Sequence, residues 1–145
     1  MLGVSNYPQD YVDACRARVR SQIEAYDALV AATRTASGER SGEVDAAFDS
    51  FEPVFYNNMV LTLDSSFVHR LRGKEGKDGN PLNEVRVLCN SLLQGKGVFS
   101  PEKAIKLEPD TSILGYAEGD EIGVRAAGFA RLSEAFFAEL ERRFV

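Results

Sequence analysis

The apolar pattern of the chain is broadest between residues 51 and 72, in the run FEPVFYNNMVLTLDSSFVHRLR. Placed on a helix at about 100° per residue, this run shows two apolar arcs. One arc holds Tyr56, Met59, Val60, Leu63, Phe67 and Leu71, and the other holds Val54, Leu61 and Val68. A helix that is apolar over so much of its circumference is normally buried in a soluble domain. The pattern therefore predicts a central helix surrounded by the rest of the chain.

Proline and glycine set the expected boundaries of this central helix. Pro53 removes one backbone donor and disfavours helix at Glu52, so we expect a break or kink near Glu52 and a central helix that begins at Pro53. Gly73 should end the helix, and a glycine-containing loop follows. Asn80 and Pro81 then favour the start of a third helix, with Asn80 as its cap. The short loop predicts that the central and third helices pack as an antiparallel hairpin.

Three other amphipathic helices accompany the central one. The first covers roughly residues 8–33 and carries a narrow apolar stripe of Val12, Cys15, Val19, Ile23, Tyr26 and Val30. The third, over residues 81–94, lines one face with Leu82, Val85, Cys89, Leu92 and Leu93. In the last helix apolar residues recur at three- and four-residue spacing, as Phe129, Leu132, Phe136, Phe137, Leu140 and Phe144. We expect the phenylalanine-rich face of this last helix to pack on the central helix.

Outside these helices the periodicity fails. Residues 1–7 are expected to form a flexible tail, and residues 96–124 an irregular segment that covers the bundle. A short β-hairpin over residues 113–124, turning at Gly119-Asp120, is one option within this cover. The sequence therefore predicts a mainly α fold: a four-helix bundle-like single domain with a central apolar helix and an irregular cover segment.

Composition and charge narrow the function. The length of 145 residues suits one domain, and the apolar fraction of 44% and charged fraction of 27% are typical of globular proteins. A net charge of −5 disfavours non-specific binding to nucleic acid or to anionic membranes, which requires an excess of positive charge. The chain shows neither a long apolar span nor a basic start followed by an apolar run, so we expect a cytoplasmic location.

Metal and cofactor chemistry are not expected. Cys15 and Cys89 each fall on the apolar stripe of a predicted helix, where a thiol behaves as a small apolar side chain. The single histidine, His69, lies far from both cysteines in the sequence. A zinc site built by the protein needs a cluster of such ligands, so core packing is the expected role of the cysteines.

Candidate chemistry gathers in the run HRLRGKEGKDGNPLN, residues 69–83, where basic side chains meet a glycine-rich loop. Arginine and backbone amides together can hold a carboxylate or phosphate, and the start of the third helix adds further donors. In the alternative interpretation, the basic residues stabilise a helix C-terminus and the glycines end the helix. Glu75 and Asp78 also cancel part of the positive charge. The spacing does not match a GxxxxGK[ST] phosphate loop.

Asn57 and Asp64 are the unusual polar residues of the central helix. They lie seven residues apart, two turns along the same side, between the apolar arcs. A carboxylate that faces the inside of a bundle needs a partner, which is either structural or a ligand. His69 is the only side chain whose ordinary pKa lies near neutrality, so it is the candidate acid or base. It lies about 140° from Asp64 around the helix, and the two do not face each other.

Residues 55–93, together with the runs SILGYAEGDEIGV and FARLSEAFFAELERRF, resemble a family of small uncharacterised bacterial proteins of actinobacterial type. The resemblance implies a single intact domain and transfers no activity.

Two hypotheses of function follow from these observations. The first is a non-catalytic helical interaction module that forms homo-oligomers, such as a homodimer, or binds a protein partner through its last helix. The second is a binding or catalytic pocket for a small anionic metabolite. Its expected ligand-binding residues are Asn57, Asp64, His69, Arg72 and Asn83, with His69 and Asp64 as catalytic candidates.

Overall fold

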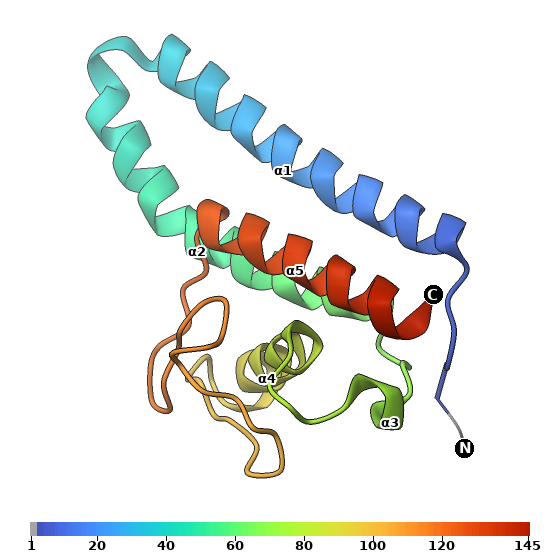
Figure 1. Ribbon diagram of the computed structural model, residues 1–145. Helices are drawn as coiled ribbons and strands as arrows, with labels where there is room; N and C mark the ends of the chain where they lie inside the picture. Colours follow the sequence, from blue (N-terminus) through green and yellow to red (C-terminus); the bar gives the residue numbers. More distant parts are fainter. Residues whose placement is uncertain (1–2) are drawn as a thin grey trace.

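The structure of the protein is a computed structural model that describes residues 3–145. Within this range the chain forms four long helices (Figure 1). They are α1 (Gln9–Ser37), α2 (Ser41–Ser65), α4 (Pro81–Gln94) and α5 (Ala126–Phe144). A short 3-10 turn, η1 (Gly38–Arg40), joins α1 to α2, and the four-residue helix α3 (Arg72–Glu75) precedes α4. The predicted mainly α, bundle-like single domain is confirmed.

The second half of α2 lies at the centre of the molecule, as the apolar pattern predicted. α2 packs against α1, α4 and α5, and Tyr56, Met59, Val60 and Leu63 are buried along it. α5 contributes the largest apolar face, with Phe129, Phe136, Phe137 and Phe144 all buried. α4 is seen nearly end-on in Figure 1 while α2 lies across the view. α4 therefore packs against α2, as expected, but the two helices cross, so the expected antiparallel arrangement is wrong.

Pro53 does not break the central helix. α2 continues through it from Ser41 to Ser65, so the expected start at Pro53 is wrong. A proline leaves the carbonyl of the residue four positions earlier without its helical donor. Here that carbonyl belongs to Asp49, and it accepts a hydrogen bond from Nη1 of Arg125 at 2.9 Å. A side chain from the segment before α5 thus replaces the donor that Pro53 lacks.

The central helix also ends earlier than expected, at Ser65 instead of Gly73. Tight turns follow, in which the amide of Phe67 donates to the carbonyl of Asp64 and the amide of Arg70 to the carbonyl of Phe67. These turns bury both Phe67 and Arg70. The second apolar arc does not form a buried face: Val54 is exposed within α2, and Val68 is exposed in the turns after the helix has ended.

The segment from residue 96 to 124 covers one end of the bundle without forming a strand. The expected β-hairpin over residues 113–124 is absent: Glu121 instead forms an isolated antiparallel bridge with Val98. The cover is held by buried apolar side chains, namely Phe99, Ile105, Ile122 and Val124. The carboxylate of Glu84 on α4 accepts hydrogen bonds from the amides of Ile113 and Leu114, both at 2.8 Å. These contacts replace strand pairing.

The N-terminal residues 3–7 are packed against the body, whereas a flexible tail was expected over residues 1–7. Residues 1 and 2 of that tail lie outside the described range. Val4 donates to the carbonyl of His69 at 2.7 Å and accepts from the amide of Leu71 at 2.8 Å. Tyr7 is buried, and its amide donates to the carbonyl of Phe144 at 2.8 Å. In the described part of the chain, no helix has the length and apolar character required to cross a membrane.

Candidate functional site

Arg70 stands at the centre of a buried polar cluster between the end of α2 and the start of α4. Its side chain is fully buried and donates to the carboxylates of Asp64 and Glu75, both at 2.7 Å. It also donates to the carbonyls of Phe67 at 3.0 Å and Leu82 at 3.1 Å. The tight turns after Ser65 place the guanidinium there. Asp64 therefore has the structural partner that its position in the helix required.

Glu75 completes this cluster from α3. Its carboxylate accepts from Arg86 at 2.7 Å and from Asn83 at 2.9 Å, in addition to Arg70. Burial alone would raise the pKa of Glu75, but the hydrogen bonds from Arg86 and the charges of Arg70 and Arg86 outweigh it and hold the pKa below its ordinary value. Glu75 is therefore a buried, ionised carboxylate between two arginines.

Asn80 and Asn83, at the start of α4, make the other hydrogen bonds of the cluster. The side chain of Asn80 caps the helix, as predicted, and accepts from the amides of Leu82 and Asn83. Asn83 donates to Glu75 and to the carbonyl of Gly76 and accepts from the amide of Gly79. Among the described residues, the buried side-chain atoms without a partner lie elsewhere. A cluster whose buried atoms are all paired in this way stabilises a fold and leaves no fully buried donor or acceptor for a substrate.

The other predicted site residues do not join this cluster. Asn57 lies two turns before Asp64 on α2. There it donates to the carbonyl of Ile122 at 3.1 Å and accepts from the amide of Val124 at 2.9 Å. Asn57 thus fastens the cover segment to α2. His69 and Arg72 are exposed, and Arg72 pairs loosely with Glu102 at 3.7 Å. The structure brings together Asp64 and Asn83 and leaves Asn57, His69 and Arg72 apart.

The two cysteines lie in the core. Cys15 and Cys89 are both free thiols and both buried. Burial raises the pKa of the Cys89 thiol far above its ordinary value, so this sulfur stays protonated. Within residues 3–145, no group of three or more potential metal ligands comes together.

The most open part of the molecule is the helical hairpin, which we define as residues 26–55 of α1, η1 and α2. In Figure 1 this hairpin extends beyond the N-terminal end of α5, and its two helices approach each other toward the η1 turn that joins them. Tyr26 marks the base, where its ring stacks on Phe55 at 4.9 Å and meets Tyr56 edge-on at 5.1 Å. Beyond this base, none of the other long helices in residues 3–145 covers the pair.

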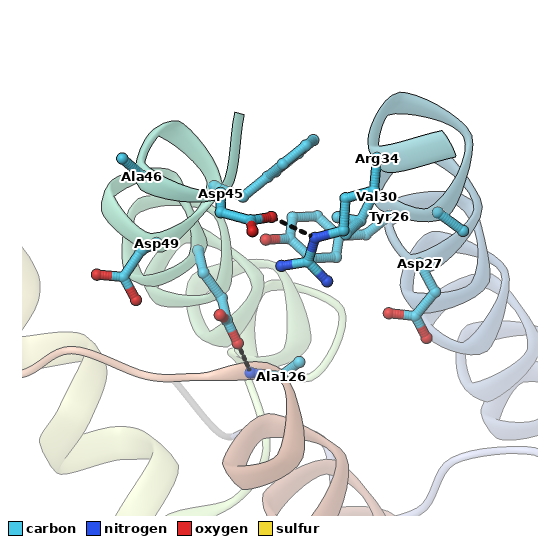
Figure 2. A pocket seen from close by; sticks show the side chains of 11 residues that line it. Tyr26, Asp27, Val30, Arg34, Asp45, Ala46, Asp49 and Ala126 are labelled. Atoms are coloured by element: carbon cyan, nitrogen blue, oxygen red, sulfur yellow. Dashed lines mark hydrogen bonds and ion pairs between the residues drawn. The ribbon is translucent and has the colours of Figure 1, made fainter. Parts of the chain in front are cut away.

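One side of the hairpin holds an acidic cleft of about 730 Å³ (Figure 2). Its lining comes from α1 and α2 and from Ala126 at the first turn of α5. The apolar part consists of Tyr26, Val30, Ala31, Ala46, Phe48 and Ala126, and the charged part of Asp27, Arg34, Asp45, Asp49 and Glu52. Four carboxylates thus meet a single lining guanidinium. The volume is in the range of small-molecule and peptide sites.

The carboxylates of the acidic cleft differ in how they are paired. Asp45 reaches across from α2 to Arg34 on α1 at 2.8 Å, as the dashed line in Figure 2 shows. Glu52 accepts from the amide of Ala126 at 2.7 Å and, like Asp49, pairs with Arg125. Asp27 has neither an ion pair nor a hydrogen bond among the described residues. The cleft therefore keeps an excess of negative charge.

The opposite side of the hairpin is apolar, and we call it the open face: Leu29, Thr33, Val44, Ala47, Phe51 and Val54. Its large side chains are strongly exposed, with Leu29 at 55%, Phe51 at 43% and Val54 at 55%. A shallow groove of about 380 Å³ lies among Thr33, Val44, Ala47, Phe48 and Phe51. Exposed apolar side chains that gather in one patch are typical of interaction surfaces, whereas scattered ones are not.

Sequence reasoning missed both surfaces, although their signals are present. On α2, Asp45, Asp49 and Glu52 recur at four- and three-residue spacing and so lie on one stripe. Ala47, Phe51 and Val54 repeat the same spacing on the other flank of Phe48. The expected break near Glu52 separated Val54 from Ala47 and Phe51 and so divided the apolar stripe, whereas the acidic stripe lies wholly before Pro53.

Comparison with known proteins leaves the chain without an identified relative. No protein-family model, no curated protein and no solved structure matches it. The resemblance to small uncharacterised bacterial proteins therefore stays a prediction.

Proposed function

We propose that this protein is a helical interaction module that self-associates through the open face of its hairpin. The observation that carries the proposal is the apolar groove that Val44, Ala47 and Phe51 line on one face of two adjacent helices. The exposed side chains of Leu29 and Val54 each lie one helical turn from a residue of that groove, Thr33 and Phe51 respectively. Burying such a patch against another apolar surface is favourable by about 25 cal/mol for each Å² removed from water. The open face therefore supplies a driving force for association.

The distribution of charge supports a second copy as the partner of the open face. The carboxylates of the hairpin that line the cleft, Asp27, Asp45, Asp49 and Glu52, lie on its other side. Two open faces related by a two-fold axis would bury apolar side chains without placing these carboxylates opposite one another. Two hairpins paired in this way would form a four-helix arrangement with a common apolar interior.

The last helix does not provide the contact that the sequence suggested. Phe129, Phe136, Phe137 and Phe144 on α5 are buried inside the protein, each at no more than 2% exposure. They are core residues of the single chain. The interaction hypothesis is therefore moved from α5 to the hairpin.

Light scattering coupled to size-exclusion chromatography tests the proposal. The unaltered protein is expected to give the mass of a homo-oligomer, most simply a homodimer, at high micromolar concentration. The combined variant Leu29→Gln, Phe51→Gln and Val54→Gln is expected to give the mass of a monomer with a retained helical circular-dichroism spectrum. Leu93→Gln is the matched control, because Leu93 is an exposed apolar side chain outside the hairpin. A clean monomer for the unaltered protein would overturn the proposal.

The second hypothesis, a pocket for a small anionic metabolite, receives less support. Arg70 already neutralises Asp64, and Asn83 is saturated by Glu75 and the surrounding backbone. His69 and Arg72 lie exposed outside that cluster. A thermal-shift screen with phosphorylated and carboxylated metabolites tests this hypothesis. A cytoplasmic location and the absence of a nucleic-acid partner remain predictions from the sequence.

A further inference from the structure

We propose that the acidic cleft on the other side of the hairpin binds a basic amphipathic helix of a protein partner. The acidic cleft is a different surface from the open face, so this inference holds whether or not the chain self-associates. Two properties carry it, the shape of the cleft and its charge, and an unpartnered hydroxyl lies beneath its base.

The shape of the cleft fits a helix because the cleft extends a groove that already holds one. In the body of the protein, α5 packs against both α1 and α2. It begins at Ala126, which lines the base of the cleft. Beyond that point α1 and α2 continue for roughly three turns, or about 15 Å, before η1 joins them. An amphipathic helix laid in a groove between helices is a recurring mode of peptide recognition.

The chemistry of the cleft selects the side chains of that helix. Tyr26, Val30 and Phe48 offer an apolar floor for one face of the bound helix. Asp27 on α1 and Asp49 on α2 carry negative charge on the two walls, as Figure 2 shows. Lysine or arginine side chains that flank an apolar stripe would meet these carboxylates. Complementary charge of this kind raises both specificity and the rate of association.

The unpartnered hydroxyl belongs to Tyr56, which does not line the cleft but packs beneath its base, with its ring 5.1 Å from the ring of the lining residue Tyr26. Tyr56 is fully buried, and its hydroxyl finds no hydrogen-bond partner among the described residues. Burial, together with the charges of Asp27 and Glu52, raises the pKa of Tyr56 to about 12. These two carboxylates line the cleft, and side chains on a helix lean toward its N-terminus, which for α2 is the cleft end. The hydroxyl is thus a protonated donor beside the base of the cleft.

Other occupants fit the cleft less well. Its carboxylates do not come together as a metal-binding group, since the described residues contain no such cluster. A second copy of the chain would bring a net charge of −5 toward walls that are already negative. Like charges brought together oppose association. A cationic helix satisfies both the shape and the charge.

Fluorescence anisotropy with two synthetic helical peptides tests the inference. Both peptides carry the same leucine stripe, and they differ only in having lysine or glutamate on the flanks of that stripe. The lysine peptide is expected to bind the full chain and to lose affinity with added salt, because the wall charges are screened. The glutamate peptide is expected not to bind.

Variants assign that binding to the cleft. The double variant Asp27→Asn and Asp49→Asn is expected to lower the affinity for the lysine peptide about tenfold, because each exposed charge pair that is lost contributes about 0.7 kcal/mol. Ala46→Trp is expected to abolish binding by filling the cleft, because Ala46 is an exposed lining residue. The double variant Asp110→Asn and Glu118→Gln is the charge-matched control, since both side chains are exposed and lie in the cover segment.

The outcomes separate this inference from the proposed self-association. Equal binding of both peptides, no binding of either, or unchanged binding by Ala46→Trp would each overturn the cleft proposal. The combined variant Leu29→Gln, Phe51→Gln and Val54→Gln should leave the lysine peptide bound. Loss of peptide binding in that variant would assign the peptide to the open face instead.

Discussion

Arg125 donates a hydrogen bond to the backbone carbonyl of Asp49, the carbonyl that Pro53 leaves without a helical donor. The same guanidinium pairs with the carboxylates of Asp49 at 3.2 Å and Glu52 at 3.4 Å. The segment that leads into α5 therefore supplies the hydrogen-bond donor that α2 lacks at Pro53. In return, the carboxylate of Glu52 on α2 accepts a hydrogen bond from the amide of Ala126 and so caps the start of α5. These reciprocal contacts join the base of the hairpin to the body.

The hydrogen bond from Arg125 to the carbonyl of Asp49 predicts an energetic coupling between Arg125 and Pro53. Arg125→Ala is expected to lower the free energy of unfolding by about 1 kcal/mol, because it removes a hydrogen bond to a helical carbonyl. In a Pro53→Ala background, the new amide can donate to Asp49, and Arg125→Ala should cost less. Urea unfolding of the four proteins of this double-mutant cycle measures the coupling. If the two substitutions change the free energy of unfolding additively, Arg125 does not replace the donor that Pro53 lacks.

The buried cluster around Arg70 predicts a graded response to mutation. Glu75→Gln is expected to lower the free energy of unfolding by about 3 kcal/mol, because two buried guanidinium groups lose their shared carboxylate. Asp64→Ala is expected to cost less, about 1 to 2 kcal/mol, since Arg70 keeps Glu75 and the Asp64 side chain is partly exposed. Chemical denaturation gives both values.

Exposed residues near the same cluster serve as controls for that series. His69→Ala and Arg72→Ala are expected to change the free energy of unfolding by no more than about 0.5 kcal/mol, because both side chains are exposed. A melting temperature of Asp64→Ala that equals the unaltered value within error would contradict the pairing of Asp64 with Arg70.

The carboxylate pKa values predict a loss of stability in acid. Arginine partners hold the pKa values of Glu75, Glu139 and Glu141 below the ordinary glutamate value of 4.5, although burial opposes this at Glu75 and Glu139. A carboxylate with a lowered folded-state pKa stabilises the fold above its unfolded pKa, and this contribution is lost as the pH falls through the folded value. The melting temperature should therefore stay level down to about pH 4.5 and fall below it.

Glu84 has the opposite effect on stability in acid. Burial raises its pKa, despite the hydrogen bonds from the amides of Ile113 and Leu114. Its burial favours the fold most at low pH and partly offsets the acid loss. Thermal melts of Glu75→Gln across the same pH range check the assignment. This variant should show a shallower fall below about pH 4.5 than the unaltered protein. An unchanged slope would show that Glu75 does not contribute to the acid transition.

The unpartnered hydroxyl of Tyr56 predicts that its removal does not destabilise the protein. Tyr56→Phe removes a buried donor that has no partner among the described residues and leaves the packed ring in place. We expect the free energy of unfolding to be unchanged or to rise by up to about 1 kcal/mol, because an unsatisfied buried group costs stability. Differential scanning calorimetry measures this change. A clear destabilisation would show that the hydroxyl is satisfied in solution.

The sequence alone was sufficient for the helices whose signals are local. The Asn80 cap and Pro81 gave the start of α4, and the phenylalanine spacing gave the buried face of α5. Both depend on residues within one or two turns of each other. The mainly α class and the burial of the second half of α2 followed from the same short-range periodicity.

Tertiary contacts decided what local rules could not. Arg125, more than seventy residues away in sequence, satisfies the carbonyl of Asp49 and lets α2 pass through Pro53. Arg70 turns inward because Asp64, Glu75 and the carbonyl of Leu82 meet there, so its buried position depends on three separate elements. The position at which α5 begins leaves the hairpin uncovered. Spacing along the chain encodes which side chains share a face, but only packing determines which of those faces remain exposed to solvent.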